Sequence, residues 1–161
     1  MGFFKKLFGS SEIEIGAPVE GQAVELSEVS DPTFGEGILG KGIAVRPTGT
    51  KVFAPCDATI DLMFDTGHAV SLVADNGAEI LIHVGLETVG LNGKHFTVHG
   101  KNGDKVKKGD LLIEFDREAI TAAGYDMITP MVICNTDKYG EVNTYVGKAV
   151  TPGEKVIGLV E

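Results

Sequence analysis

The sequence predicts an all-β protein, a compact antiparallel β-sandwich with quasi-duplicated halves and at most short helical turns. Twenty-two glycines and six prolines in 161 residues indicate frequent turns, which is typical of many short strands. Apolar residues make up 43% of the chain, a globular rather than a disordered composition. At this length we expect one packed domain.

The first twelve residues differ from the rest of the chain and are expected to form a flexible N-terminal segment. The domain itself is expected over residues 13–161. A basic amphipathic segment can lie on an anionic membrane, although eight residues do not hold a helix in water. A plain disordered tail is the alternative. On a helix, four apolar residues would share one side, next to two lysines: Phe3, Phe4, Leu7 and Phe8 beside Lys5 and Lys6.

Two pairs of similar segments predict the duplication. Residues 17–26 and 54–63 both begin with Ala-Pro, continue through an acidic turn and then alternate like a strand. Residues 105–113 and 149–157 both place Gly-Asp or Gly-Glu before an apolar run. Repeated segments of this kind indicate quasi-symmetric halves. Recurrent turn chemistry is the alternative explanation.

A β-hairpin is predicted where residues 69–74 and 80–84 flank an Asn-Gly pair. If Asn76 and Gly77 alone form the loop, His83 lies opposite Val70 and His68 lies opposite Gly85. Side chains alternate between the two faces of a sheet. This register therefore puts five side chains on one face: His68, Val70, Leu72, Leu81 and His83.

On that face the two histidines become diagonal neighbours, with Cα atoms roughly 7–8 Å apart. Each could be an ordinary hydrogen-bonded histidine at a sheet surface. Two imidazoles on one face favour proton, metal or phosphoryl chemistry instead, because histidine titrates near neutral pH.

Other segments of the chain carry weaker signals. The glycine-rich stretch 34–47 lacks the Gly-Lys-Ser/Thr sequence of a nucleotide loop, so we expect a backbone-rich wall beside a site. His95 and His99 fall in a polar, glycine-rich loop and are interpreted as solvated. Residues 116–124 predict the one short helix, ended by Gly124. Residues 129–135 predict a buried strand.

The net charge of −9 argues against nucleic acid as a partner and favours partners that carry Arg or Lys. The chain has no signal-peptide pattern and no apolar span of 18 residues. We therefore expect a cytoplasmic protein, with peripheral contact at the inner membrane face through residues 1–11.

Several motifs in order resemble the glucose-type IIA component of the bacterial phosphoenolpyruvate-dependent sugar phosphotransferase system. They are 42–49 (GIAVRPTG), 66–69 (TGHA), 82–89 (IHVGLETV), 129–135 (TPMVICN) and the two Ala-Pro segments. The similarity runs from about residue 13 to the C-terminus, and the 82–89 block is the most specific part. Gly67, Cys56 and Ala58 depart from the family pattern without touching the histidines.

The resemblance implies a duplicated hybrid-motif β-sandwich and a phosphoryl relay that needs no cofactor. In the family, the carrier protein HPr donates a phosphoryl group to one histidine, which passes it to a cysteine of a IIB domain during sugar uptake. By motif, His83 is the phosphorylated residue and His68 its partner. Thr66 would orient His68, and the backbone at Gly85 would accept the second ring N–H of His83. Regulatory protein targets are a further expectation.

A partner-docking surface around the histidines is also expected, with an apolar centre that excludes water and an acidic rim. Its predicted members are Asp31, Phe34, Ile38, Phe64, Val70, Leu72, Leu81, Glu87, Val89 and Asp137.

Two alternatives remain at this point. His68 and His83 could bind zinc, with a partner protein and water completing the shell, because two protein ligands are too few for a closed site. A metallopeptidase-like domain would need a His-x-His pair that the sequence lacks. A lipoyl-type carrier would need a lysine at a hairpin tip, where this chain has Asp75-Asn76-Gly77.

Overall fold

The structure, a computed structural model, describes residues 12–161. The predicted N-terminal segment 1–12 thus lies outside the described residues except for Glu12. The regular secondary structure of the described residues is mostly β-strand, with two short α-helices and three short 3-10 helices. The strands are β1 (Ile13–Gly16), β2 (Gly21–Glu25), β3 (Lys41–Pro47), β4 (Lys51–Phe53), β5 (Ala58–Met63), β6 (Ala69–Ala74), β7 (Glu79–His83), β8 (Phe96–Val98), β9 (Lys105–Val106), β10 (Leu111–Phe115), β11 (Thr129–Ile133), β12 (Glu141–Thr144), β13 (Lys148–Val150) and β14 (Lys155–Val160). The helices are η1 (Leu26–Glu28), α2 (Pro32–Gly35), η2 (Thr88–Leu91), α3 (Arg117–Ala122) and η3 (Thr136–Lys138).

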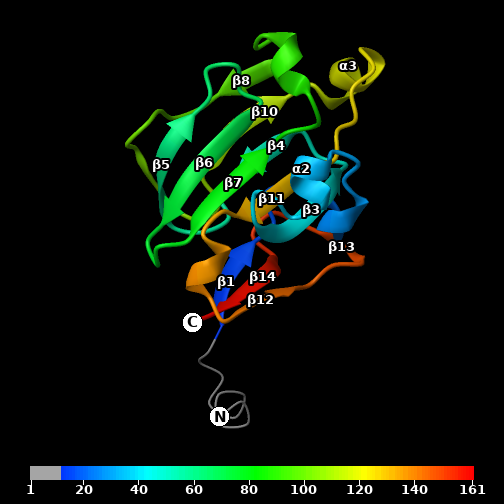
Figure 1. The fold of residues 1–161 in the computed structure, drawn as a ribbon. Coiled ribbons are helices and arrows are strands. Elements are labelled where there is room, and N and C mark those ends of the chain that lie inside the picture. Colours follow the sequence, from blue (N-terminus) through cyan, green and yellow to red (C-terminus); the bar gives the residue numbers. More distant parts are fainter. Residues whose placement is uncertain (1–11) are drawn as a thin grey trace.

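The strand orders confirm the predicted duplication. The large sheet runs β13-β2-β3-β11-β7-β6-β5-β9, and the small sheets run β1-β14-β12 and β4-β10-β8. Each of the strands β4 to β10 has a counterpart, in the same order, in the set β1, β2, β3, β11, β12, β13, β14. The halves meet where β7 pairs with β11. In Figure 1, β1 and β14 lie side by side at the bottom and β8 and β10 at the top.

The predicted register of the β6–β7 hairpin is wrong by one residue. Ala69 lies opposite His83 and Val70 opposite Ile82. The loop has three residues rather than two, because Ala74 and Ala78 pair directly and the Gly77 N–H donates to the Ala74 carbonyl at 2.8 Å. Gly77 closes this turn with a φ of +96°. Since side chains alternate along a strand, the slip exchanges the two faces of β6.

The large sheet has apolar side chains on both faces. The inner face belongs to the main core, which includes Val70, Leu72 and Ile82. The outer face carries a smaller cluster, covered by the segment that contains η1 and α2. In Figure 1, α2 lies in front of β3 and β11. The buried members of this outer cluster are Val24, Leu26, Val29, Phe34, Ala44, Leu86, Ile128 and Val132, with Leu39 and Leu81 packed against them.

The predicted helix near residue 116 is present as α3. The Asp116 side chain accepts a hydrogen bond from the Ala119 N–H, and Gly124 follows the helix with a φ of +98°. The strand predicted at residues 129–135 is β11, and all five of its residues are buried. Within residues 12–161, no helix is both long and apolar enough to cross a membrane.

Candidate functional site

The two histidines of the hairpin region come together on the outer face of the large sheet. His83 is the last residue of β7, and His68 directly precedes β6. Their ring centroids are 5.2 Å apart and the rings are inclined at 72°. His68 reaches this position because it lies outside the β6 ladder, after Gly67 with a φ of +72°. The alternation that governs β6 therefore does not apply to it.

One ring nitrogen of His83 is committed to the backbone. Nδ1 lies 2.6 Å from the carbonyl oxygen of Gly85. A carbonyl can only accept, so Nδ1 carries the proton and Nε2 keeps a free lone pair. Gly85 has a φ of +78°, and a Cβ there would lie 2.7 Å from the Thr88 methyl group. Only glycine fits this turn, which carries the acceptor two residues beyond the histidine.

His68 is held by a different set of contacts and is only 6% exposed. Its Nδ1 is hydrogen-bonded to the Thr66 hydroxyl. Its carbonyl oxygen accepts from the Val84 N–H at 2.7 Å, which joins it to the strand that carries His83. The Phe64 ring packs edge-on against its imidazole, with centroids 5.0 Å apart. Two contacts thus hold the ring, and one holds its backbone.

Phe34 forms the apolar wall behind His83. Its ring centroid lies 5.3 Å from that of His83, and Phe34 itself is 5% exposed. The short helix α2 places it there. Asp31 caps this helix by accepting a hydrogen bond from the Thr33 N–H at 3.0 Å. The glycine-rich stretch 34–47 thus contributes the Phe34 side chain to the site, where the sequence predicted a wall of backbone.

Burial lowers the pKa of both imidazoles. For His68 the main cause is desolvation, with the neighbouring His83 a second cause. For His83 desolvation also dominates, and it outweighs the Gly85 carbonyl and Asp31, which act in the opposite direction. Both rings are consequently neutral near pH 7. A neutral imidazole with one free nitrogen is a competent nucleophile.

The residues predicted to form the docking surface do not all reach the surface. Val70 and Leu72 are 0% and 1% exposed and belong to the inner core, a consequence of the register slip. Their assignment to a surface was wrong. Asp137 lies in η3, which directly follows Asn135. The Asn135 side chain accepts a hydrogen bond from the Glu79 N–H, at the start of β7, whereas His83 lies at the end of that strand.

Of the other predicted members, Phe34 contacts the His83 ring and Phe64 contacts the His68 ring. Ile38 and Val89 are 69% and 53% exposed, and Glu87 is also exposed. Phe64, Leu81 and Asp31 are half-buried, whereas Phe34 is buried behind His83. The exposed apolar surface near the site is thus smaller than the sequence predicted.

The remaining histidines lie elsewhere. His99 is half-exposed and pairs with Glu114 at 2.7 Å between Nε2 and Oε2. His95 is partly exposed, with a φ of +77°. Among residues 12–161 no group of three or more His, Cys, Asp or Glu side chains is arranged to hold a metal ion. The zinc and metallopeptidase alternatives therefore find no support.

Sequence reasoning missed two residues that shape the turn after His83. The buried Thr88 hydroxyl donates to the Val84 carbonyl at 2.6 Å. The Asp126 carbonyl accepts from the Leu86 N–H at 2.9 Å. Thr88 belongs to the 82–89 block, but nothing in its spacing indicated this bond. Asp126 is about forty residues away in sequence and carried no signal.

Comparison with known proteins gives a consistent result. Residues 13–139 match the family model for the phosphoenolpyruvate-dependent sugar phosphotransferase system, EIIA 1. The chain is 44% identical to a "PTS system glucose-specific EIIA component" of Oceanobacillus iheyensis, with 96% of each chain covered. It is 41% identical to a protein of the same description from Staphylococcus aureus, covering 97% of this chain and 98% of the relative.

Longer relatives and a solved structure extend this result. The chain is 47% identical to a "PTS system beta-glucoside-specific EIIBCA component" of Bacillus subtilis, of which it spans about a quarter. The glucose permease IIA of Mycoplasma capricolum has the same fold, with a TM-score of 0.86 and 29% identity, covering 94% of this chain and 97% of that one.

Proposed function

Because the chain belongs to the EIIA 1 family of the phosphoenolpyruvate-dependent sugar phosphotransferase system, we propose that His83 is the residue that carries the phosphoryl group. Family membership makes the chain a phosphotransferase component of a sugar-transport phosphorelay. The observation that carries the assignment of His83 is its Nδ1–H···O=C bond to Gly85, which leaves Nε2 free beside His68.

In the proposed step, the Nε2 lone pair of His83 attacks the phosphorus of a phosphohistidine on the donor protein. The new N–P bond forms as the donor's N–P bond breaks, and the donor nitrogen keeps the electron pair. Phosphoryl transfer mainly requires positioning and stabilisation of charge on the equatorial oxygens. The Gly85 carbonyl supports the step by stabilising the positive charge that develops on the His83 ring.

His68 is proposed to stabilise the charge on the moving group. If the Thr66 hydroxyl donates to Nδ1 of His68, the ring proton lies on Nε2 and can be donated to a phosphoryl oxygen. The separation of the two rings leaves His68 near the group that His83 would carry without sharing its bond. Since this imidazole supplies the hydrogen bond, the proposed mechanism needs no metal or other cofactor.

The proposed partners are the phosphocarrier HPr as donor and the cysteine of a IIB domain as acceptor. The EIIBCA relatives support a IIB partner, because there one chain carries the A part together with B and C parts. The proposed contact surface is the predicted set without the buried Val70 and Leu72 and without Asp137. Its members are Asp31, Phe34, Ile38, Phe64, Leu81, Glu87 and Val89. Further protein targets of regulation remain an expectation from the family.

We also propose that residues 1–11 contact the membrane, on the basis of their apolar residues and two lysines. Removing these residues should weaken co-sedimentation with anionic vesicles and leave phosphoryl transfer in solution unchanged. Equal co-sedimentation of the two forms would make the segment a plain tail.

The test of the proposed site is His83→Ala, with His99→Ala as the matched control. Each protein is incubated with phosphoenolpyruvate and the general phosphotransferase proteins, and its intact mass is measured. The wild type and His99→Ala should gain one acid-labile phosphate, and His83→Ala none. An acid-labile phosphate on folded His83→Ala would overturn the assignment.

A further inference from the structure

The carbonyl group that holds the His83 proton belongs to a residue that does little to fix its own backbone. Gly85 has a φ of +78°, in the left-handed region that glycine enters without strain. Glycine also has the widest choice of backbone conformations of all residues. The direction of its carbonyl must therefore be set by groups that hold the two peptide planes on either side of it.

Apart from the bond to His83 itself, each of these planes is held by one hydrogen bond. The plane between Val84 and Gly85 is held by the Thr88 hydroxyl, which donates to the Val84 carbonyl at 2.6 Å. The plane between Gly85 and Leu86 is held by the Leu86 N–H, which donates to the Asp126 carbonyl at 2.9 Å. Val84 and Thr88 are both 0% exposed, so water does not compete for the first bond. Fixing both planes fixes φ and ψ of Gly85, and with them its carbonyl.

We infer that Thr88 is a positioning residue for phosphoryl carriage, whose hydroxyl orients the Gly85 carbonyl and so keeps the His83 proton on Nδ1. The inference rests on the proposed role of His83. Without the hydroxyl, the buried Val84 carbonyl has no hydrogen-bond donor. The peptide plane between Val84 and Gly85 then rotates until this carbonyl reaches a different donor. The Gly85 carbonyl then turns away from Nδ1, and the proton redistributes to Nε2. That tautomer has no lone pair on the nitrogen that attacks phosphorus.

The test compares two variants that separate the hydroxyl from the methyl group. Thr88→Val removes the hydroxyl and keeps the shape, while Thr88→Ser keeps the hydroxyl and removes the methyl that packs against Gly85. The first readout is the ¹⁵N spectrum of the His83 ring, which distinguishes the two tautomers and requires no phosphoryl transfer. The second is the rate of phosphate acceptance from HPr.

We expect Thr88→Val to show a large Nε2–H population at His83 and acceptance slowed by about tenfold or more, because a small misplacement of a reacting group can cost up to about 10²-fold. Thr88→Ser should keep the Nδ1–H tautomer and a rate close to that of the wild type. Thr136→Val is the control, because the Thr136 hydroxyl also donates to a backbone carbonyl, that of Ile133 at 2.6 Å, and Ile133 pairs with Ile80, toward the other end of β7 from His83. It should leave the His83 spectrum unchanged.

Two results would overturn the inference. The first is an unchanged His83 spectrum in folded Thr88→Val. The second, which remains available if Thr88→Val does not fold, is a shift of the tautomer in Thr88→Ser, since that would assign the effect to the methyl group. Failure of the proposed function is distinguishable, because it would appear as phosphate on His83→Ala while the ring spectra remained as expected.

Discussion

Two polar clusters in the molecule contain groups with a lowered pKa, and the two shifts have opposite causes. At His68 and His83 the pKa values fall because burial disfavours the charged imidazole. At Glu12 the pKa falls to about 2 because hydrogen bonds from Lys155, Tyr145 and Asn143 favour the charged carboxylate. The same direction of shift therefore leaves the histidines neutral and the glutamate ionised.

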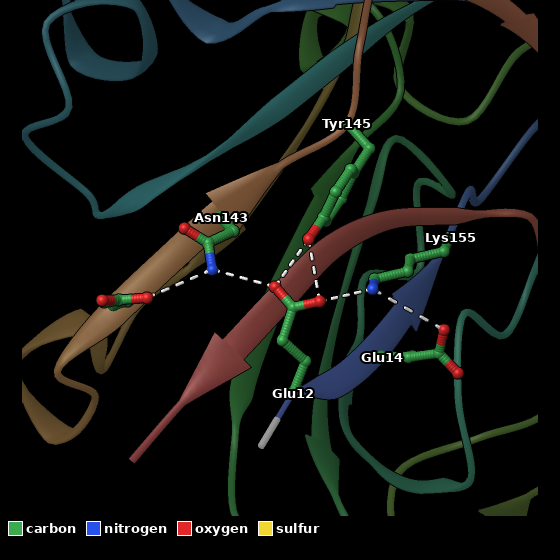
Figure 2. A network of polar contacts seen from close by, with 6 residues as sticks. Glu12, Glu14, Asn143, Tyr145 and Lys155 are labelled. Carbon is green, nitrogen blue, oxygen red and sulfur yellow. Dashed lines mark hydrogen bonds and ion pairs between the residues drawn. The ribbon is translucent and has the colours of Figure 1, made fainter. Parts of the chain in front are cut away.

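The surroundings of the two clusters explain the difference. The histidines are bounded by two aromatic rings, a hydroxyl and a backbone carbonyl. Glu12 lies among charged and polar side chains of β12, β14 and the loop after β12, as Figure 2 shows. One cluster keeps two imidazoles neutral, and the other joins the start of β1 to the C-terminal strands. The comparison predicts that changes at the first alter transfer and changes at the second alter stability.

The largest effect on transfer, apart from loss of His83 itself, is expected from His68→Gln. Glutamine can still donate a hydrogen bond but cannot become positively charged as charge builds on the phosphoryl oxygens. We expect the variant to accept phosphate at His83 and to pass it to the IIB cysteine about 10²–10³ times more slowly. The measurement is a two-step assay in which the phosphorylated variant is isolated and then mixed with purified IIB.

His99→Gln is the control for that assay, because the His99 ring pairs with Glu114 and takes no part in the contact between His68 and His83. It should pass phosphate on at the wild-type rate. Normal onward transfer by His68→Gln would reduce His68 to a structural neighbour, and failure at the first step would make it part of the acceptor machinery instead.

The pH dependence of the two rings gives a second, smaller effect. Both should titrate below the ordinary value of 6.5, which ring ¹H–¹⁵N spectra measured against pH can check. Acceptance by His83 should be insensitive to pH above 6.5 and fall about tenfold per unit once pH is below the lowered pKa. A midpoint above 6.5 for either ring would contradict the assignment of burial as the dominant cause.

The same shifts affect the free energy of unfolding, and the sign follows from proton uptake. As pH falls below 6.5, the unfolded chain binds protons at these histidines before the folded protein does. The stabilisation is therefore complete above 6.5 and is lost progressively as pH falls to the lowered pKa values. Replacing both histidines with neutral glutamine should remove this part of the pH dependence.

The sequence sufficed for the fold class and the duplication, but not for the hairpin register. The histidine pair forms as predicted, although the register from which it was predicted is wrong. The Asn-Gly pair located the turn correctly, yet Asp75 joins it to make a three-residue loop. A shift of one residue exchanges the faces of β6, so Val70 and Leu72 were placed on the wrong side. Leu81 and His83 share a face as predicted, because they are two residues apart on β7. That relation does not depend on how β7 pairs with β6.

The supporting contacts of the site could not be predicted for another reason. The pairing of Asp126 with Leu86 and the packing of Phe34 on His83 join segments about forty to fifty residues apart. No periodicity links such segments before the fold is known. The resemblance to a family pointed to the residues that are proposed to react, whereas the residues that hold them emerge only from the structure.

The Glu12 cluster owes its geometry to a neighbouring glycine. A Cβ at Gly158 would lie 2.5 Å from the Glu12 carboxylate, so β14 leaves room for the side chain there. The Tyr145 hydroxyl donates to the carboxylate at 2.6 Å, and the Lys155 ammonium lies 4.5 Å from the centre of the Tyr145 ring. Lys155 also pairs directly with Glu12. These contacts make the carboxylate the centre of the network.

The smallest expected effect is that of Glu12→Gln, which removes the charge and keeps the size. Because the cluster is partly open to solvent, we expect a loss of only about 1 kcal/mol in the free energy of unfolding at pH 7. Glu14→Gln is the control, since Glu14 is mostly exposed and lies 3.9 Å from Lys155. It should change stability less.

The Glu12 contribution is present above pH 4.5 and is lost as pH falls toward about 2, so the difference from the wild type should shrink over that range. Phosphate acceptance at His83 should match the wild type throughout. A slower acceptance rate in folded Glu12→Gln would show that the two clusters are coupled, and the division between transfer and stability would then fail.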